Sequence, residues 1–390
     1  MRIAPKHWGQ SRILRFLMTS VLLVCAAGIK ASAQSNEPWP EAKAWEWHQK
    51  VGWLVGCNFI PSTAINQLEM WQADSFDPTT IDRELGYAEG LGFNTARVFL
   101  HNLLWTQDSA GFLDRMEQFL KIADKHHIKP IFVFFDSCWD PNPKLGKQHE
   151  PKPFTHNSGW VQSPGREYIS HPERLDELKV YIVGVLGHFK DDQRIAMWDL
   201  FNEPDNLNNN SYDKNEDPNK KQTTLVLLRK VFQWAREVNP SQPVSSGVWQ
   251  GRWANKAVLE DFEKVQLLQS DVITFHNYGK PREVNVCIAS LRNYHRPIVC
   301  TEYMARPAGS TFDPILGIFK KQDVGACNWG FVSGKTQTIF PWDSWTKAYT
   351  DEPPLWFHDI LHPDGTPYKS QEVDYIRKIT QASEAAGKAP

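Results

Sequence analysis

The sequence lacks several features that would place it in a common class of protein. It carries 43 Lys and Arg against 45 Asp and Glu, a formal net charge of -2, so no positive excess is present to hold a phosphate backbone. With 41% hydrophobic residues, the chain is too apolar to be disordered. No stretch after residue 33 reaches the roughly 18 apolar residues of a membrane-spanning helix. We therefore expect a folded protein that binds neither nucleic acid nor, once its first residues are removed, a membrane.

The motifs that hold metals and nucleotides are also missing from the sequence. There is no Cys-x-x-Cys pair, which argues against a zinc site, and no Gly-x-Gly-x-x-Gly turn, which argues against dinucleotide binding. There is no Gly-x-Ser-x-Gly elbow to support a serine esterase. We therefore expect no metal and no organic cofactor.

Cysteine is sparse and odd in number after residue 33. At least one thiol therefore stays free or pairs between chains. The sequence leaves open whether any two of them pair. These cysteines are Cys57, Cys138, Cys287, Cys300 and Cys327.

The first 33 residues have the pattern of a secretory signal peptide. Basic residues over 2–15 precede an apolar run over 16–29 that is short for a membrane span, and Ala31-Ser32-Ala33 supplies the small residues of a cleavage site. Valine precedes Cys25, where a lipoprotein signal needs a small residue, so we do not expect lipidation. The pattern predicts a secreted or periplasmic protein that begins at Gln34.

Aromatic residues, in contrast, are abundant. The chain has 17 Trp, 21 Phe and 10 Tyr, more than a core requires. Flat aromatic faces can cover the C–H faces of sugar rings, so carbohydrate is the first ligand class that this composition favours. The alternative for any single Trp is that it packs in the core.

Apolar strand-like runs alternate with helix-spaced segments along the chain. Eight buried strands, each followed by a helix, are typical of an α/β fold with a parallel sheet, and eight such units can close into a (β/α)8 barrel. An open doubly wound sheet is the alternative. We predict a lead-in over residues 34–50 and a single barrel domain over 51–385. The predicted strands cover 53–60, 93–100, 128–135, 194–201, 243–248, 271–276, 297–301 and 324–331.

Two carboxylates directly follow predicted strands. Glu203 follows the fourth strand and Glu302 the seventh. The carboxyl ends of barrel strands meet at one face, so we expect the two side chains to lie close together. Paired carboxylates are what glycoside hydrolysis uses: one gives a proton to the leaving oxygen, and the other attacks the anomeric carbon or activates water.

The segment Trp198-Asp199-Leu200-Phe201-Asn202-Glu203-Pro204 resembles the Asn-Glu-Pro motif of the cellulase-type glycoside hydrolases, family 5 and its relatives in a retaining (β/α)8 clan. In that family the Glu is the general acid/base and the Asn binds the 2-hydroxyl of the sugar. The resemblance gives these roles to Glu203 and Asn202.

Further positions match the same family in chain order across about residues 50–335. Glu302, in Ile-Val-Cys-Thr-Glu-Tyr, matches the nucleophile, and Arg97 matches an Arg near it. His276 and Tyr278 match a His-x-Tyr motif whose Tyr orients the nucleophile. Trp329 matches a platform for the sugar ring.

One departure from the family puts the substrate in doubt. Many cellulases place His-Asn after the third strand to bind sugar, whereas this strand ends in Phe135-Asp136-Ser137. His101-Asn102, after the second strand, is a loose substitute, so His101 is a candidate substrate-binding residue. Asp136 and His156 are expected either to contact substrate or to lie at the surface.

The resemblance implies a secreted retaining glycoside hydrolase that cleaves a β-linked plant-type polysaccharide or oligosaccharide, cellulase-like or xylanase-like, by double displacement. An exo-acting enzyme of the same clan is an alternative, of the β-mannosidase, β-galactosidase or arabinofuranosidase type. Long loops after the third and eighth strands would favour such attack at a chain end. A non-catalytic carbohydrate-binding barrel and a transglycosylase also remain open, and the oligomeric state is not predicted.

Overall fold

The computed structural model describes Met1 and residues 37–386, so the predicted signal peptide lies outside the described residues. Residues 37–386 contain an eight-stranded sheet in the order β5-β4-β3-β2-β1-β8-β7-β6, and all of its paired strands are parallel. The strands are β1 (Val55–Asn58), β2 (Thr95–Phe99), β3 (Lys129–Asp136), β4 (Met197–Asn202), β5 (Val244–Ser245), β6 (Ile273–His276), β7 (Ile298–Glu302) and β8 (Val324–Asn328).

The two ends of this sheet meet just beyond β5. The backbone N–H of Val248 donates to the carbonyl of Thr274 at 3.1 Å, and the N–H of His276 donates to the carbonyl of Val248 at 2.9 Å. These bonds join β5 to β6 and close the barrel. The prediction of a (β/α)8 barrel is confirmed, and the open doubly wound sheet is excluded.

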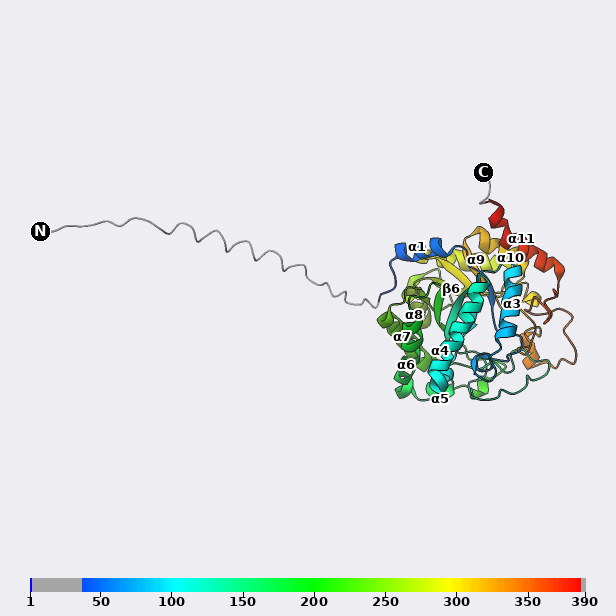
Figure 1. Ribbon diagram of the computed structural model, residues 1–390, viewed down its shortest axis with the longest axis horizontal. Helices are drawn as coiled ribbons and strands as arrows, with labels where there is room; N and C mark the ends of the chain where they lie inside the picture. The colour runs from blue at the N-terminus through cyan, green and yellow to red at the C-terminus, as the bar shows by residue number, and fades with distance from the viewer. Residues whose placement is uncertain (2–36, 387–390) are drawn as a thin grey trace. The chain divides into compact units, whose positions relative to one another are not determined.

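Helices cover the outside of the barrel and connect its strands (Figure 1). Local sequence explains their starts: α3, for example, begins at Pro78, and the side chain of Asp77 accepts the N–H of Thr80. The helices that follow α1 (Glu41–Val51) are α2 (Gln67–Trp71), α3 (Pro78–Gly90), α4 (Asn102–Lys125), α5 (Arg166–Ile169), α6 (Lys179–Phe189), α7 (Lys220–Val238), α8 (Asp261–Gln269), α9 (Pro281–Leu291), α10 (Phe312–Lys321) and α11 (Ser370–Ala386).

One predicted helix is displaced. The sequence predicts a helix around residues 256–263, but a short 3-10 turn (Lys256–Val258) comes first, and α8 begins only at Asp261. A capping box explains the later start, because Glu260 and Glu263 satisfy each other's backbone N–H groups.

The predicted lead-in forms α1, which closes the N-terminal end of the barrel. Trp47 and Val51 pack on a buried cluster that includes Leu54, Ile131 and Val299. The indole of Trp47 also donates to the carbonyl of Ala196 at 3.2 Å. In Figure 1, α1 lies at the end of the barrel opposite to α5, which belongs to the long connection after β3. The opposite, C-terminal face is therefore where the long loops gather.

Three long loops follow strands at that C-terminal face. We call residues 137–165 the third loop, 203–219 the fourth loop and 329–369 the eighth loop, after the strands that they follow. The fourth loop contains 213–217, which the sequence indicates to be a solvated segment. The side chain of its Glu216 is instead only 6% exposed and binds the ammonium group of Lys220 at 2.7 Å.

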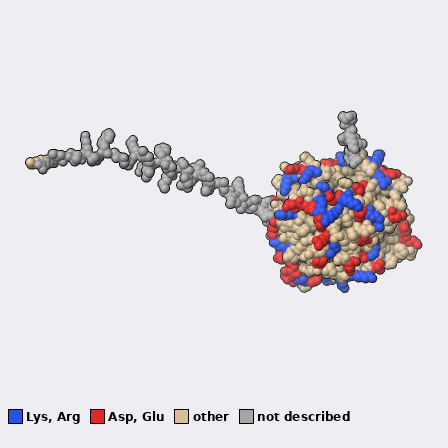
Figure 2. Space-filling view, viewed as in Figure 1, with Lys and Arg blue, Asp and Glu red and all other residues tan. Residues whose placement is uncertain are grey.

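Other expectations concern thiols, membranes and charge. All five cysteines in the described residues are free. No helix within residues 37–386 is long and apolar enough to cross a membrane. On the face drawn in Figure 2, positive and negative side chains are interspersed.

Candidate active site

Glu203 and Glu302 lie together at the C-terminal face of the barrel. Glu302 is the last residue of β7, and Glu203 directly follows β4. Both are buried: Glu203 has 7% of its surface exposed and Glu302 has 5%. An oxygen of each carboxylate and a ring nitrogen of His276 lie within 4.8 Å of one another. The structure thus brings together the two carboxylates that the sequence singled out.

Arg97 on β2 organises this pair. Its guanidinium is fully buried and donates five hydrogen bonds, which is its full capacity. Two go to Asp199 (3.1 and 2.8 Å), and one each goes to Glu302 (2.8 Å), Asn202 (2.6 Å) and Asn58 (2.9 Å). Burial alone would lower the pKa of Arg97, but the two carboxylates raise it above its usual value. The group is therefore a fixed positive charge beside Glu302.

Glu302 is held by two donors, one on each oxygen. Arg97 donates to Oε1, and the hydroxyl of Tyr278 donates to Oε2 at 2.9 Å. Burial raises the pKa of Glu302, whereas the charge of Arg97 and the hydrogen bond from Tyr278 act to lower it. Both donors favour the ionised carboxylate and fix its orientation.

Glu203 has a different environment. Its Oε1 lies 2.8 Å from Nδ1 of His276, and its Oε2 accepts from Asn206 Nδ2 at 2.7 Å and from the Cys138 thiol at 3.3 Å. No cation binds it directly among the described residues. Burial raises the pKa of Glu203 to about 7, and the hydrogen bonds from Asn206 and Cys138 act against this rise. Near neutral pH this carboxyl is therefore poised to give or take a proton.

The backbone also aims the Glu203 side chain. Its φ is +41°, in the left-handed region that non-glycine residues rarely adopt, and Pro204 follows it. Such strain persists where the surrounding structure enforces it, and it is frequent at functional sites.

His276 bridges the two carboxylates. Its Nδ1 lies 2.8 Å from Glu203 and 3.6 Å from Glu302. Burial lowers the pKa of His276 to about 4, although Glu302 acts to raise it. The ring is thus neutral at physiological pH and shares a hydrogen bond with Glu203 without adding a charge.

Asn202 is fixed by neighbours at both ends of its amide. Its Oδ1 accepts from Arg97, and its Nδ2 donates to Asp136 Oδ1 at 2.9 Å. Asp136 also accepts from the indole of Trp160 at 2.7 Å, and burial raises the pKa of Asp136 to about 6. Asp136 is only 1% exposed, so the expectation of a surface position for it is wrong. It supports Asn202 from within the protein.

The carboxylates open into a cleft lined by aromatic rings. The cleft measures about 1490 Å³, counted out into open solvent. The third loop contributes Trp139. Trp329 directly follows β8, and the rest of the eighth loop contributes Trp342 and Trp345. Trp249, which follows β5, completes the set. The abundance of Trp is therefore concentrated in part around the paired carboxylates.

Polar groups from the fourth and eighth loops line the rest of the cleft. They come from residues 208–211 and from Asp343 and Thr346. A cleft of aromatic faces with amide, hydroxyl and carboxylate groups between them matches the C–H faces and hydroxyls of sugars.

Of the eight residues expected from the sequence, His101 is placed differently from the others. It caps the N-terminus of α4 by accepting the N–H of Leu103, and its Nε2 bonds the carbonyl of Gln162 at 2.9 Å. Both ring nitrogens are thus used within the protein, and His101 does not line the cleft. The structure favours a supporting role for it. The eight residues are Arg97, His101, Asn202, Glu203, His276, Tyr278, Glu302 and Trp329.

Sequence reasoning missed several groups that surround the carboxylates. Asn58 and Asp199 lie inside apolar strands, and a polar residue in such a run is a signal that could have been used. Asn206 is three residues after Glu203, a short spacing that could also have been used. Cys138 and Trp249 lie in loops or beyond a strand end, and no pattern in the sequence places them near Glu203.

The paired carboxylates and His276 are also the residues that could hold a metal ion. Within the described part of the chain, Glu203, His276 and Glu302 are the one group of three residues with this potential. The four carboxylate oxygens already pair with Arg97, Tyr278, His276 and Asn206, an arrangement that suits an acid and base pair.

Comparisons with known proteins bear on the fold. No protein-family model matches the chain, and no curated protein matches it. Among solved structures, a GH5_18 protein from Streptomyces cattleya in complex with Manb1-4GlcNAc superposes with a TM-score of 0.56 and 12% identity, over 87% of this chain and 82% of that chain. The chain has the (β/α)8 fold of the family 5 glycoside hydrolases.

Two further solved structures share this fold. An exo-beta-1,4-mannosidase from Opitutaceae bacterium strain TAV5 superposes with a TM-score of 0.56 and 19% identity, over 87% of this chain and 61% of that chain. An endo-1,4-beta-mannanase from Rhizomucor miehei gives 0.53 and 17%, over 86% and 95%. The fold that the resemblance implied is thus shown independently of the sequence motif.

Proposed function

We propose that this protein is a retaining glycoside hydrolase that acts on a β-linked glycan. The observation that carries the proposal is the distance between the carboxylates: Glu203 and Glu302 have oxygens within 4.8 Å. Retaining enzymes hold the two groups about 5–5.5 Å apart, whereas inverting enzymes need about 6.5–9.5 Å to admit a water between them.

The unequal surroundings of the two carboxylates assign their roles. Glu302, beside Arg97, attacks the anomeric carbon and forms a glycosyl ester. Glu203, whose pKa is raised to about 7 by burial, protonates the leaving oxygen. It then takes a proton from the water that hydrolyses the ester. His276 and Asn206 orient Glu203 through both steps.

For the substrate, we propose a β-1,4-linked mannoside. The support is the nature of the neighbours, which include an exo-beta-1,4-mannosidase and an endo-1,4-beta-mannanase. This choice replaces the cellulase-like or xylanase-like substrate that the sequence resemblance implied, and it agrees with the absence of the His-Asn pair after β3. A panel of aryl β-glycosides and of mannan, xylan and glucan decides among the sugars.

The catalytic roles are tested by alanine variants with added azide. We expect Glu203→Ala to lower kcat by roughly 10²- to 10⁴-fold on a substrate with a poor leaving group. Azide should then restore turnover of an activated aryl glycoside and give the β-glycosyl azide. With Glu302→Ala, azide should attack directly and give the α-glycosyl azide. NMR of the azide products distinguishes the two variants.

A matched control uses another buried carboxylate. Glu84 does not line the cleft, and it accepts a hydrogen bond from the Ser62 hydroxyl at 2.5 Å. Glu84→Gln should therefore keep turnover close to that of the natural protein. Full turnover in Glu203→Ala or Glu302→Ala would refute the roles, and an inverted first product from the natural protein would refute retention.

We also propose that the protein acts outside the cytoplasm after its first 33 residues are removed. The support is the signal-like pattern of basic, apolar and small residues at the start of the chain.

A further inference from the structure

The cleft is closed on one side by contacts between two loops. The third loop follows β3 and the eighth loop follows β8, and in the barrel order β1 and β2 lie between these two strands. The two loops meet over the ends of β1 and β2: the N–H of Asn157 in the third loop donates to the carbonyl of Thr336 in the eighth loop at 2.8 Å, and both residues line the hollow above Asn58 and Phe99.

Such contacts are numerous. The backbone N–H of His156 donates to the Ser344 hydroxyl at 3.0 Å, and its ring Nδ1 lies 2.8 Å from the carbonyl of Phe340. The indole of Trp345 donates to the carbonyl of His156 at 2.9 Å. The rings of Trp139 and Trp345 stack with centroids 5.7 Å apart and planes 16° apart. The two loops thus form one continuous wall.

The fourth loop extends this wall. The ring of Tyr212 meets Trp345 edge-on at 4.9 Å, and its hydroxyl donates to the carbonyl of Ser158 at 3.3 Å. Three loops are therefore joined around the stacked indoles of Trp139 and Trp345.

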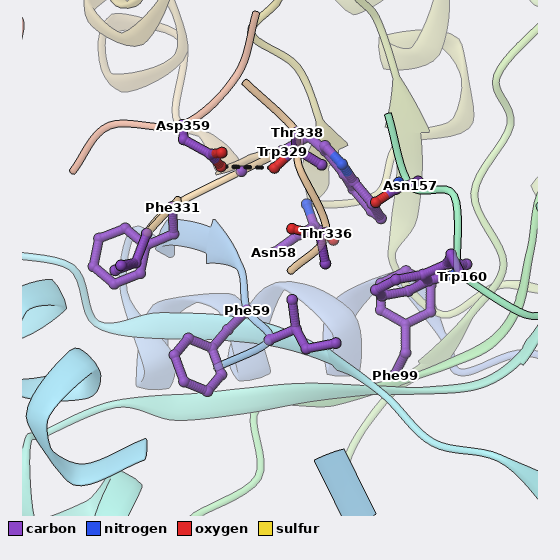
Figure 3. Close-up of a pocket in the computed structure, with 13 residues that line it drawn as sticks. Asn58, Phe59, Phe99, Asn157, Trp160, Trp329, Phe331, Thr336, Thr338 and Asp359 are labelled. Carbon is purple, nitrogen blue, oxygen red and sulfur yellow. Dashed lines mark hydrogen bonds between the residues drawn. The ribbon is translucent and has the colours of Figure 1, made fainter. Parts of the chain in front are cut away.

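The space over β1 and β2 is narrow and is covered by the same two loops. Asn58, Phe59 and Phe99, at or next to the ends of these strands, line a hollow of about 350 Å³, counted out into open solvent, and are absent from the lining of the cleft, although Asn157 and Trp329 line both spaces. Asn157 and Thr338 from the two loops cover it, at 1% and 3% exposure. Figure 3 shows this hollow between Asn157 and Trp160 on one side and Asp359 and Phe331 on the other.

The opposite side of the cleft is open. Beyond Glu203 the hollow continues along Trp249, Asn277 and Gly279, over β5 and β6. Glu203 protonates the leaving oxygen, so the leaving part of the substrate lies on this open side. The sugar that bonds to Glu302 points the other way, over Trp329 and towards the wall.

From this geometry we infer that the protein cleaves at chain ends, taking the terminal sugar of the non-reducing end into the closed side and leaving the rest of the chain in the open side. The inference rests on the proposed function and deepens it. The wall of the third and eighth loops is the feature that excludes internal cleavage, because a chain that continued past the terminal sugar would meet Trp139 and Trp345.

The first test follows products from β-1,4-mannotetraose whose reducing end has been converted to the alditol. We expect mannose and the trisaccharide alditol as the only initial products. A 1:1 initial formation of mannobiose and the disaccharide alditol would overturn the inference. No turnover of any mannoside or other β-glycoside would instead overturn the proposed function itself, so the two failures are distinguishable.

The second test blocks the non-reducing end with a 4-O-linked sugar that the protein does not release. We expect the rate on this substrate to fall at least about 100-fold, whereas cleavage at an unchanged rate would overturn the inference. The double variant Trp139→Gly/Trp345→Gly opens the wall and should recover part of the lost rate. Trp45→Ala on α1, at the other end of the barrel, serves as the control and should recover none. Equal behaviour of a correctly folded double variant and the control would also overturn the role of the wall.

Discussion

Two buried glutamates with different neighbours supply the chemistry of this site. Glu302 touches a guanidinium and a phenol, whereas Glu203 touches a neutral imidazole, an amide and a thiol. Of the two glutamates, only Glu302 binds the guanidinium of Arg97 directly. Two identical side chains can thus differ in protonation, because different groups donate hydrogen bonds to each of them.

Cys138 offers a direct test of this account. Its thiol donates to Glu203 and so lowers the pKa of that carboxyl, while burial raises the pKa of the thiol well above its usual value and keeps it protonated. Turnover needs protonated Glu203, so kcat/KM should fall above about pH 7. In Cys138→Ala the pKa of Glu203 rises, and this fall should move to higher pH. The measurement is the pH profile of kcat/KM with a poor leaving group.

The charged groups that face Glu203 are otherwise unchanged in this variant; they are Arg97, Asp205 and Glu302. Cys287→Ala removes a thiol that accepts a hydrogen bond from Asn277 and does not bond Glu203; it is the matched control and should leave the profile in place. A fall at lower pH in Cys138→Ala would contradict the role of the thiol.

At the residue scale the sequence predicted the groups that stand at strand ends. Glu203, Glu302, Arg97 and Trp329 follow or interrupt apolar runs, where a barrel places its C-terminal face. Cys138 could not be predicted, because its approach to Glu203 depends on the path of the third loop. That path is set by contacts over long separations in the chain, which local sequence does not encode.

The long loops are elements held by buried polar side chains. Glu216 accepts bonds from Lys220, Asn208 and Gln162, at 2.7, 2.5 and 2.7 Å. These donors belong to α7, the fourth loop and the third loop. A single carboxylate therefore joins two walls of the cleft to a barrel helix.

Removing the cation from this group should loosen both loops. Lys220→Met leaves Glu216 buried without its counter-charge, and breaking a buried pair costs about 3–5 kcal/mol. We expect a loss of this size in the free energy of unfolding, measured by urea denaturation. Lys221→Met, at the exposed neighbouring position, should cost little.

A second substitution checks the cause of that loss. In Lys220→Met/Glu216→Gln no charge remains buried at this point, so part of the lost stability should return. If the two residues act independently, the loss in the free energy of unfolding of the double variant should equal the sum of the losses in Lys220→Met and Glu216→Gln. That additive result would contradict the proposed cause.

All eight strands were predicted in the right place, because most of them lie in apolar runs, whereas the loops were not. The segment 213–217 has the charged composition of a solvated loop, yet Glu216 is buried because α7 brings Lys220 beside it. Composition reports the average surroundings of a segment, whereas the role of one carboxylate depends on a partner that the fold supplies.

At the scale of the whole molecule, the barrel is closed at its N-terminal end by α1. The sequence predicted eight strand–helix units because each carries its own periodic pattern. It left 34–50 as a lead-in, because the contact of Trp47 with Ala196 joins positions 149 residues apart. The structure makes α1 part of the folded domain.

This arrangement constrains where the natural chain can be cut. We expect the mature protein to begin at Gln34, which removes the signal-like segment and keeps α1 intact. N-terminal sequencing of the protein recovered from the periplasm or culture medium of its natural host measures this directly. A chain that starts beyond Glu41, or one that retains Met1 and stays in the cytoplasm, would contradict the expectation.

The guanidinium of Arg97 has a consequence for how the molecule is assembled. Its five bonds reach side chains on β1, β4 and β7 from a position on β2, so strands distant in the chain and not all adjacent in the sheet meet at one planar group. The reactive geometry exists only when those four strands are in register around it. A partly folded barrel is therefore inert, and the first turnover of a refolding chain marks the moment at which its construction is complete.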